Sequence, residues 1–258
     1  MTEVRYAALE AGATDFLTKP IDKHEFIPRV RNMLQLRAAM AATAHRADEL
    51  AIAVKMATAE IHLRERETIM RLARAAEFRD PETGAHILRM AHYSALIAQQ
   101  LGLPGEAIDM LLSAAPMHDV GKLGTPDHIL LKPGRLTAEE MGIMRQHANI
   151  GYEILRNSSS PMLQMAAEIA LNHHEKFDGS GYPNSKTGQD IPLTGRIVAV
   201  ADVFDALTSD RPYKPAWELT RAREHLIAGR GSHFDPACVD IFIANWDKVL
   251  EIRSIHQD

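Results

Sequence analysis

The chain has 258 residues, of which 46% are hydrophobic, and its 29 basic and 34 acidic residues give a formal net charge of −5. This composition is typical of a globular protein with room for one large domain and a smaller appendage. The mildly negative charge offers no overall attraction for nucleic acid or an anionic membrane, so neither is an expected partner. A single cysteine excludes an intramolecular disulfide, and no secretion signal or long apolar run is present, so we expect a cytoplasmic protein.

The first residues are expected to form a strand between two helices. After a helix end and a turn at Ala11–Ala13, residues 15 to 18 predict a short strand, and Asp22 is a good N-cap for the next helix. The sequence AGATDFLTKPID resembles the end of a receiver domain of a response regulator, in which the lysine contacts the phosphoacceptor site and the peptide before the proline is typically cis.

This resemblance covers only residues 1–37 and lacks the upstream strands, the acidic pocket and the phosphoacceptor aspartate. We therefore interpret the segment as a receiver remnant that cannot work as a phosphorylation switch, and we expect an output that does not depend on phosphorylation. The alternative is an unrelated strand, loop and helix in which Lys19-Pro20 occurs by chance.

Residues 26 to 78 predict one long helix, because glycine is almost absent and no proline follows Pro28. Leu50, Val54, Ala57 and Ile61 recur at intervals of four and three, which is the pattern of a coiled-coil-like seam. We interpret residues 38–76 as a linker through which two copies form a homodimer. A solvated single helix is the alternative.

Residues 77–258 alternate helical patterns with short loops and predict an all-α domain. The expected helices cover residues 81–101, 104–118, 137–155, 161–174, 196–208, 216–228 and 236–250. The stretch from 175 to 196 carries too many glycines and prolines for regular structure, so we expect it to form the rim of an active site.

Several histidines and carboxylates fall at spacings that suit a cluster of metal ions. Glu82 and His86 are four residues apart, so a helix would project both from one face, although a surface Glu-His contact would explain this pair alone. The adjacent His118 and Asp119 end an apolar helix that Gly121 stops. Since neighbouring helical residues diverge by about 100 degrees, such a pair suits two neighbouring ions, with the aspartate bridging them.

Four further residues extend this pattern. His173 and His174 repeat the arrangement at another helix end. Asp202 directly follows the apolar run at residues 197–201, where an unpaired carboxylate would be costly to bury. A lone histidine such as His147, on a semi-apolar helix, is more often a core residue than a ligand. Each position has such an ordinary explanation, but a metal cluster explains all of them together.

The strings HDVGK at 118–122, HHEKFDGSGYP at 173–183 and ADVFDALTSDRPYK at 201–214 resemble the HD-GYP family of the HD superfamily, which hydrolyses the bacterial second messenger cyclic di-GMP. The match extends from about residue 75 to residue 214 and implies an HD-superfamily helical bundle. It implies the metal ligands His86, His118, Asp119, His147, His173, His174 and Asp202. Glu82 matches a position that carries a carboxylate only in trinuclear members, so we expect two or three divalent ions, Fe(II) or Mn(II).

Such a centre implies hydrolysis of a phosphodiester by a hydroxide held between two ions, with cyclic di-GMP giving pGpG, GMP or both. We expect Asp119 and Lys122 to take part in catalysis, with Asp80 and Asp205 as weaker candidates for a base or for partners behind the ligands. The resemblance also implies the substrate contacts Lys122, Tyr182, Arg211 and Lys214.

Two other functions stay open. The domain could be a catalytically weak receptor for cyclic di-GMP that signals through protein contacts, with GGDEF-type or other signalling proteins as partners. It could also be an HD-superfamily hydrolase for another nucleotide, although the His-His pair and the GYP loop argue against this.

Overall fold

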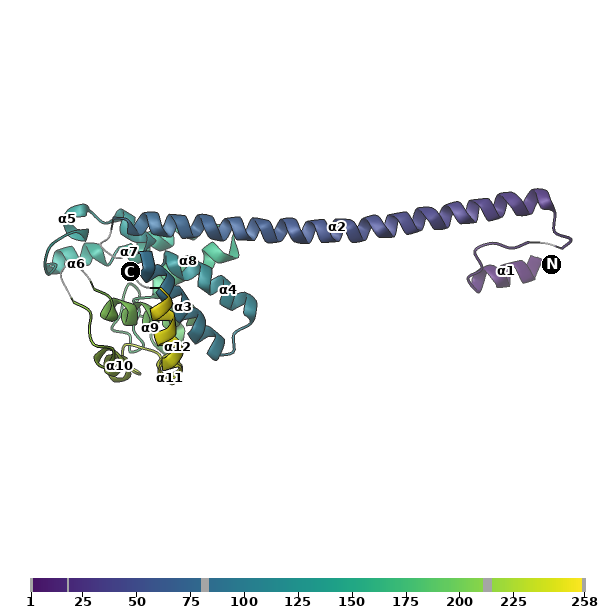
Figure 1. Cartoon of the computed structure of the whole chain (residues 1–258). Helices are drawn as coiled ribbons and strands as arrows, with labels where there is room; N and C mark the ends of the chain where they lie inside the picture. Colours follow the sequence, from purple (N-terminus) through teal and green to yellow (C-terminus); the bar gives the residue numbers. More distant parts are fainter. Residues whose placement is uncertain (1, 18, 80–83, 211–214, 257–258) are drawn as a thin grey trace. The chain divides into compact units, whose positions relative to one another are not determined.

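The computed structural model describes residues 2–17, 19–79, 84–210 and 215–256, and the chain divides into two compact units, residues 1–63 and 64–258 (Figure 1). Within the described residues, regular structure is entirely helical apart from one isolated β-bridge between Arg230 and Phe234. The predicted all-α class is therefore confirmed.

The first unit holds α1 (Thr2–Glu10) and the start of α2 (Lys23–Glu77). Asp22 caps α2 by accepting a hydrogen bond from the His24 amide at 2.8 Å, and the Lys19–Pro20 peptide bond is cis. The strand expected at residues 15–18 was wrong for its described part, because Asp15–Leu17 form no strand. A strand needs a neighbour to complete its hydrogen bonds, and no described residue supplies one; the Asp15 carboxylate instead accepts from Arg29.

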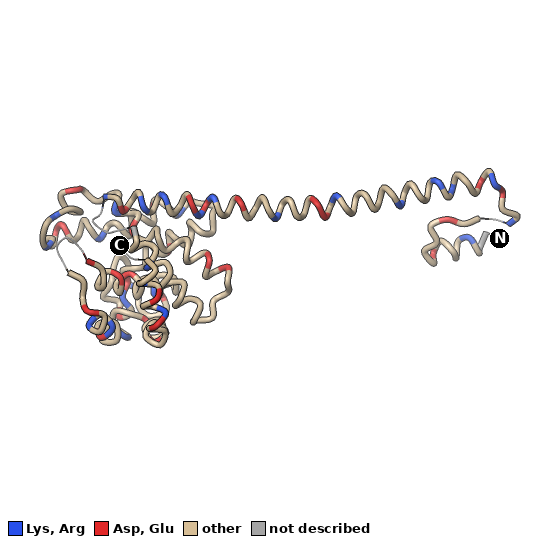
Figure 2. The backbone as a smooth tube through the Cα atoms, in the orientation of Figure 1, with Lys and Arg blue, Asp and Glu red and all other residues tan. Residues whose placement is uncertain are grey.

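α2 is a single helix of 55 residues, as the scarcity of breakers predicted. Acidic and basic residues are interspersed along it (Figure 2), and pairs one turn apart, such as Glu67 and Arg71 at 2.6 Å, support the helix. Its apolar residues Leu50, Val54 and Ile61 are exposed, whereas Ile69, Ala73 and Ala76 near its end are buried. Among the described residues, no helix has both the length and the apolar character that crossing a membrane requires.

The second unit continues with a bundle of short helices. They are α3 (Gly84–Gln100), α4 (Gly105–Ala114), η1 (Ala115–Met117), η2 (Val120–Gly124), α5 (Asp127–Leu130), α6 (Ala138–Met144), α7 (His147–Leu155), α8 (Pro161–Asn172), η3 (Gly188–Asp190), α9 (Leu193–Thr208), α10 (Leu219–Ala228), α11 (Pro236–Ala244) and α12 (Trp246–Ile255).

Three expected helices are interrupted. The helix expected over 104–118 ends as α4, and the 3-10 turn η1 follows, because Pro116 has no amide hydrogen to continue an α-helix. The helix expected over 137–155 is two helices, α6 and α7, separated by a turn at Arg145 and Gln146, which makes His147 the first residue of a helix. The helix expected over 236–250 is divided at Asn245, whose φ and ψ of −106° and 32° are not helical.

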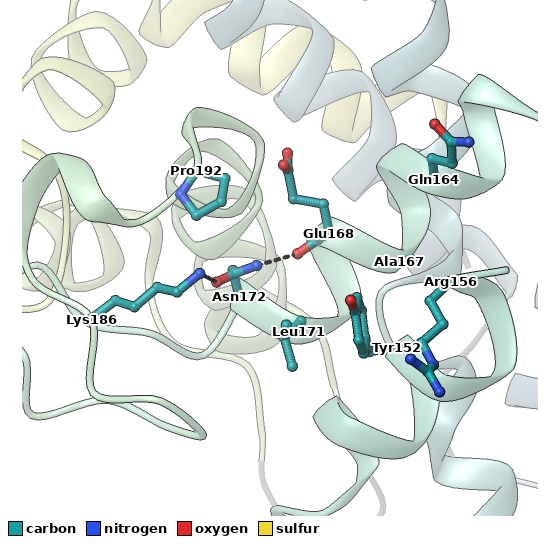
Figure 3. Close-up of a pocket in the computed structure, with 9 residues that line it drawn as sticks. All are labelled: Tyr152, Arg156, Gln164, Ala167, Glu168, Leu171, Asn172, Lys186 and Pro192. Carbon is teal, nitrogen blue, oxygen red and sulfur yellow. Dashed lines mark hydrogen bonds between the residues drawn. The ribbon is translucent and has the colours of Figure 1, made fainter.

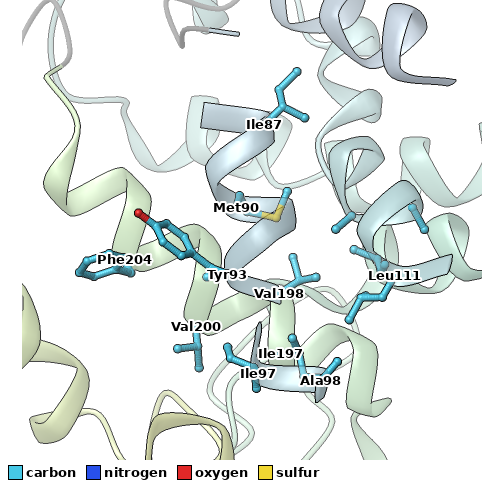
Figure 4. Close-up of a cluster of buried hydrophobic side chains, with 14 of the residues drawn as sticks. Ile87, Met90, Tyr93, Ile97, Ala98, Leu111, Ile197, Val198, Val200 and Phe204 are labelled. Carbon is cyan, nitrogen blue, oxygen red and sulfur yellow. The ribbon is translucent and has the colours of Figure 1, made fainter. Parts of the chain in front are cut away.

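The core of this unit surrounds α3. Its residues Ile87, Met90, Tyr93 and Ile97 are fully buried, and Figure 4 shows them beside residues of α9 such as Phe204. The Tyr93 and Phe204 rings meet edge to face with centroids 5.3 Å apart, an arrangement that adds to the gain from apolar burial. This packing fixes α3 against α9 and thereby places His86 opposite Asp202.

Candidate metal centre

The structure brings seven of the expected metal ligands together in two groups. His86, His118 and Asp202 form one group, and Asp119, His147, His173 and His174 form the other; within each group, one donor atom per residue lies within 4.8 Å of all the others. The ligands come from α3, the turn between η1 and η2, the start of α7, the end of α8 and α9. Helix ends thus supply most of the donors.

Asp119 lies between the two groups. Its Oδ2 atom is 3.2 Å from Nε2 of His118, and its Oδ1 atom is 3.2 Å from Nε2 of His147 and 3.6 Å from Nε2 of His173. On the other side, Oδ1 of Asp202 lies 3.8 Å from Nε2 of His118. A carboxylate with one oxygen directed at each group has the geometry to bridge two cations.

Backbone carbonyls orient three of the histidines. The Nδ1 atom of His118 is 3.1 Å from the Ala115 oxygen, that of His147 is 2.7 Å from the Met144 oxygen, and that of His173 is 3.1 Å from two carbonyls of α8. Because a carbonyl only accepts hydrogen bonds, Nδ1 carries the proton in each ring, and the lone pair of the neutral imidazole is on Nε2.

These inward Nε2 atoms show that the site fits a metal. Within the described residues, Nε2 of His118, His147 and His173 and Oδ1 of Asp119 are buried and have no hydrogen-bond partner. Leaving one such group unsatisfied costs about 1–3 kcal/mol, so a cluster of them requires compensation. Divalent cations that accept imidazole nitrogen and carboxylate oxygen would supply it.

The charges of the centre are also suited to a cation. Burial opposes ionisation of Asp119, but Lys122 and His118 hold the pKa of its carboxyl well below the ordinary value. Burial and the neighbouring His173 and His147 push the pKa of His174 well below its usual range, so this ring is neutral and can coordinate. Burial lowers the pKa of His118, but Asp119 and Asp202 outweigh it and raise that pKa to about 9; a bound cation would displace this proton.

Asp205 lies behind His86. It is fully buried, and its Oδ2 atom is 2.8 Å from Nδ1 of His86, while Arg89 donates to both of its oxygens. Because both oxygens are occupied in this way, the geometry supports a partner behind the ligands rather than a base. Arg89 was not anticipated from the sequence, although it stands three residues after His86 and therefore on the same face of α3.

Two of the expected substrate contacts are at the edge of the centre. Nζ of Lys122 is 2.8 Å from Oδ2 of Asp119, and the ring of Tyr182 is 4.7 Å from that of His174. The guanidinium of Arg145 lies over the same tyrosine at 5.1 Å from the ring centroid. The other expected site residues, Asp80, Glu82, Arg211 and Lys214, lie outside the described residues.

Glu175 holds the loop that carries Tyr182. Its buried carboxylate accepts the backbone N–H groups of Asn184 at 2.7 Å and Lys186 at 3.1 Å. Nζ of Lys186 then donates to Oδ1 of Asn172 at 2.9 Å, beside a pocket of about 340 Å³ (Figure 3). Neither Glu175 nor Asn172 was expected to have a role, although both directly flank the His-His pair in the sequence.

The fold and the site define an HD-domain protein. The sequence profile of the HD domain matches residues 27–238, so the chain belongs to this family. It is 51% identical over 240 residues to the cyclic di-GMP phosphodiesterase response regulator RpfG of Xanthomonas campestris. The aligned residues cover 93% of this chain and 64% of that protein. It is 38% identical over 264 residues to a cyclic di-GMP phosphodiesterase of Thermotoga maritima, covering 100% of this chain and 72% of that protein.

A third relative has a different named substrate. The 3′3′-cGAMP-specific phosphodiesterase 2 of Vibrio cholerae is 48% identical over 196 residues, which cover 75% of this chain and 38% of that protein. The chain therefore spans less than two thirds of the Xanthomonas and Vibrio relatives. Among solved structures, the V. cholerae phosphodiesterase V-cGAP3 matches with a TM-score of 0.54 at 20% identity, over 72% of this chain and 50% of that chain, which shows a shared fold.

Proposed function

We propose that the protein is a metal-dependent phosphodiesterase that hydrolyses cyclic di-GMP to pGpG, GMP or both. The observation that carries this proposal is the buried pair of donor groups joined by Asp119, with inward histidine nitrogens that have no partner among the described residues. The cyclic di-GMP phosphodiesterases of Xanthomonas and Thermotoga support the choice of substrate.

The residues that would hold the ions are His86, His118 and Asp202 for one and His147, His173 and His174 for the next, with Asp119 between them. When bound, divalent ions would supply Lewis-acid activation of water and neutralise charge on the phosphodiester. All these donors are nitrogen or oxygen, and the thiol of Cys238 is buried in the core, with a pKa that burial raises to about 12. This donor set favours Fe(II) or Mn(II) over a thiolate zinc site. Glu82 is our candidate ligand for a third ion.

The side chains at the edge would bind the substrate. The ammonium group of Lys122 is within reach of a phosphate oxygen of a ligand that approaches Asp119, and this hydrogen bond would be charge-assisted. The ring of Tyr182, whose centroid lies 4.7 Å from that of His174, is our candidate contact for a base of the substrate. Arg211 and Lys214 remain proposed contacts for phosphate or guanine.

3′3′-cGAMP is a second candidate substrate, because a relative of 48% identity is named for it. Both dinucleotides present phosphodiesters to the same centre and differ in one base. Discrimination between them would therefore come from residues that contact the bases rather than from the metal ligands.

We propose the following organisation for the rest of the protein. Residues 1–37 would be a receiver-like remnant, 38–76 a linker and 77–258 the phosphohydrolase domain, acting in the cytoplasm in second-messenger signalling. The exposed apolar residues Leu50, Val54 and Ile61 on α2 support pairing with a second copy. A signalling protein of the GGDEF type is a candidate partner.

An anaerobic assay tests the enzymatic proposal. The purified protein is supplied with Fe(II) or Mn(II), and cyclic di-GMP and 3′3′-cGAMP are offered separately while products and metal content are followed. We expect hydrolysis that is abolished in His118→Asn and Asp119→Asn and is unchanged in His128→Asn, which alters an exposed histidine. Intact dinucleotides in the presence of bound metal would contradict the proposal and favour a receptor.

A further inference from the structure

Two pairs of side chains face each other across α3 and α9. On α3, His86 and Arg89 are one turn apart, and on α9, Asp202 and Asp205 are one turn apart. Nε2 of His86 lies 3.9 Å from Oδ1 of Asp202, and Arg89 lies against Asp205. His86 also contacts the second aspartate of α9, since its Nδ1 atom is 2.8 Å from Oδ2 of Asp205.

Arg89 is buried, with 4% of its surface exposed, and its guanidinium is directed at Asp205. Its Nε atom donates to Oδ1 at 2.7 Å, and its Nη2 atom donates to Oδ2 at 3.0 Å. Nη2 also donates to Oγ of Ser209 at 2.8 Å, and Nη1 donates to the carbonyl of His256 at 2.9 Å. A guanidinium that is buried and engaged in this way does not contact a substrate.

His86 depends on this arrangement more than the other oriented ligands do. His118, His147 and His173 are oriented by backbone carbonyls of their own helical turns, which no side-chain substitution removes. His86 is oriented instead by the side chain of Asp205, which in turn is fixed by Arg89. A carboxylate in this position keeps the proton on Nδ1 and leaves the lone pair on Nε2, the atom that faces Asp202 and His118.

We infer that Arg89 is a positioning residue of the metal centre: it fixes the Asp205 carboxylate, which sets the tautomer and ring orientation of His86. This inference rests on the proposed metal-dependent function. The alternative is a buried ion pair that only ties α3 to α9. A structural tie would affect stability, whereas a positioning role also affects the tautomer of His86 and the affinity of the group formed by His86, His118 and Asp202.

The test compares four variants of the full chain. Arg89→Met removes the guanidinium, Arg89→Lys keeps the charge without the two-pronged contact, and Asp205→Asn keeps the volume but presents an amide to two donors. Arg253→Met is the matched control, because Arg253 donates to the carbonyl of Thr208 at the end of α9 and forms no hydrogen bond or ion pair with Asp205 among the described residues. The readouts are thermal unfolding, the tautomer of His86 in the metal-free protein by ¹⁵N-histidine NMR, assigned with His86→Gln, and anaerobic titration with Mn(II).

We expect wild type and Arg253→Met to show the Nδ1–H tautomer of His86 and the same Mn(II) affinity. In Arg89→Met and Asp205→Asn, His86 should no longer be held in a single tautomer. The affinity for the most weakly bound Mn(II) ion should fall about 10–100-fold relative to wild type, and Arg89→Lys should show an intermediate affinity. Folded variants that keep the tautomer and the Mn(II) affinity would overturn the inference. If Arg89→Met does not fold, Arg89→Lys and Asp205→Asn decide the question.

Failure of the proposed function would look different. A wild-type protein that binds no Mn(II) would refute the metal centre, while the tautomer of His86 in the metal-free protein would still report whether Arg89 acts through Asp205. A wild-type protein that binds Mn(II) with an affinity that none of the Arg89 or Asp205 variants changes would refute the positioning role alone.

Discussion

Gly121 lies so close to the start of α7 that a Cβ atom on it would stand 1.9 Å from the carbonyl oxygen of His147. The same atom would be 2.5 Å from the amide nitrogen of Gly151. Backbone meets backbone here, so no side-chain movement could relieve the contact. This approach holds η2, which begins just after Asp119, against the helix that begins with His147.

We predict that Gly121→Ala damages the site and the fold together. The added methyl group must push η2 away from α7, which separates Asp119 from His147, and overpacking of this kind costs about 1–3 kcal/mol. A displacement of about 1 Å can lower turnover about 10²-fold. Hydrolysis of cyclic di-GMP, Mn(II) binding and the midpoint of thermal unfolding should all fall.

Gly142→Ala is the control for this prediction. Gly142 is exposed within α6, and a Cβ on it would meet nothing within 4 Å. Alanine is a better helix former than glycine, so this variant should be as stable as wild type or more stable by about 0.5–1 kcal/mol, with unchanged turnover. Equal effects of the two substitutions would show that the contact between Gly121 and His147 does not matter.

Helix geometry predicted where two adjacent pairs of proposed ligands stand in the fold. His118 and Asp119 at a helix end, and His173 and His174 at another, lie where the spacing indicated. The position of His147 was misjudged, because the turn at Arg145 and Gln146 has no proline to mark it; it was expected within a helix and instead begins one.

Contacts between distant segments could not be predicted in the same way. Arg89 and Asp205 are separated by 116 residues, and nothing in the local pattern of either segment specifies the other. The strand expected at residues 15–18 is absent from its described residues, 15–17, for a related reason, since a strand depends on a partner that local sequence does not reveal. The all-α class, in contrast, followed from the helical patterns and the short loops between them.

We predict that Lys122→Met lowers turnover of cyclic di-GMP by about 10²-fold without loss of metal. In the proposed function the ammonium group, which lies 2.8 Å from Oδ2 of Asp119, would stabilise charge on the phosphate, and removing one such donor commonly has an effect of this size. Turnover and bound Mn(II) per chain are measured together. Loss of metal in the variant would instead show that Lys122 acts mainly on Asp119.

Lys132→Met is a suitable control for Lys122→Met. Lys132 also pairs with a carboxylate, that of Glu140 at 2.6 Å, but in a partly exposed position between α5 and α6. Such a solvent-accessible pair contributes little to stability. Turnover should stay unchanged in this variant.

His233 should make the protein less stable in acid. Burial, with help from Lys176 and His225, lowers the pKa of His233 to about 4 from an ordinary value of 6.5. Between pH 6.5 and about pH 4, His233 is therefore protonated in the unfolded chain but neutral in the folded chain. The stabilising contribution of the neutral ring is fully present above about pH 6.5 and is lost as the pH falls toward 4.

Denaturant unfolding at about pH 7.5 and about pH 5 measures this effect. His233→Gln should lose less stability than wild type between the two conditions, because glutamine takes up no proton. His128→Gln, at an exposed histidine, should behave as wild type does. An identical pH dependence in His233→Gln and wild type would assign the acid sensitivity to other groups.

Glu175→Gln should loosen the loop that carries Tyr182. The two carboxylate oxygens accept the backbone N–H groups of Asn184 and Lys186, and an amide in the same place would turn its NH₂ group toward one of them. The unsatisfied amide costs about 1–3 kcal/mol locally, so hydrogen exchange at residues 184–186 should accelerate and turnover should fall. Glu168→Gln is the control, because Oε1 of Glu168 accepts only from the hydroxyl of Thr194 among the described residues, which a glutamine oxygen can still do. Faster exchange with unchanged turnover would show that the loop need not be held for catalysis, and would remove Tyr182 as a proposed substrate contact.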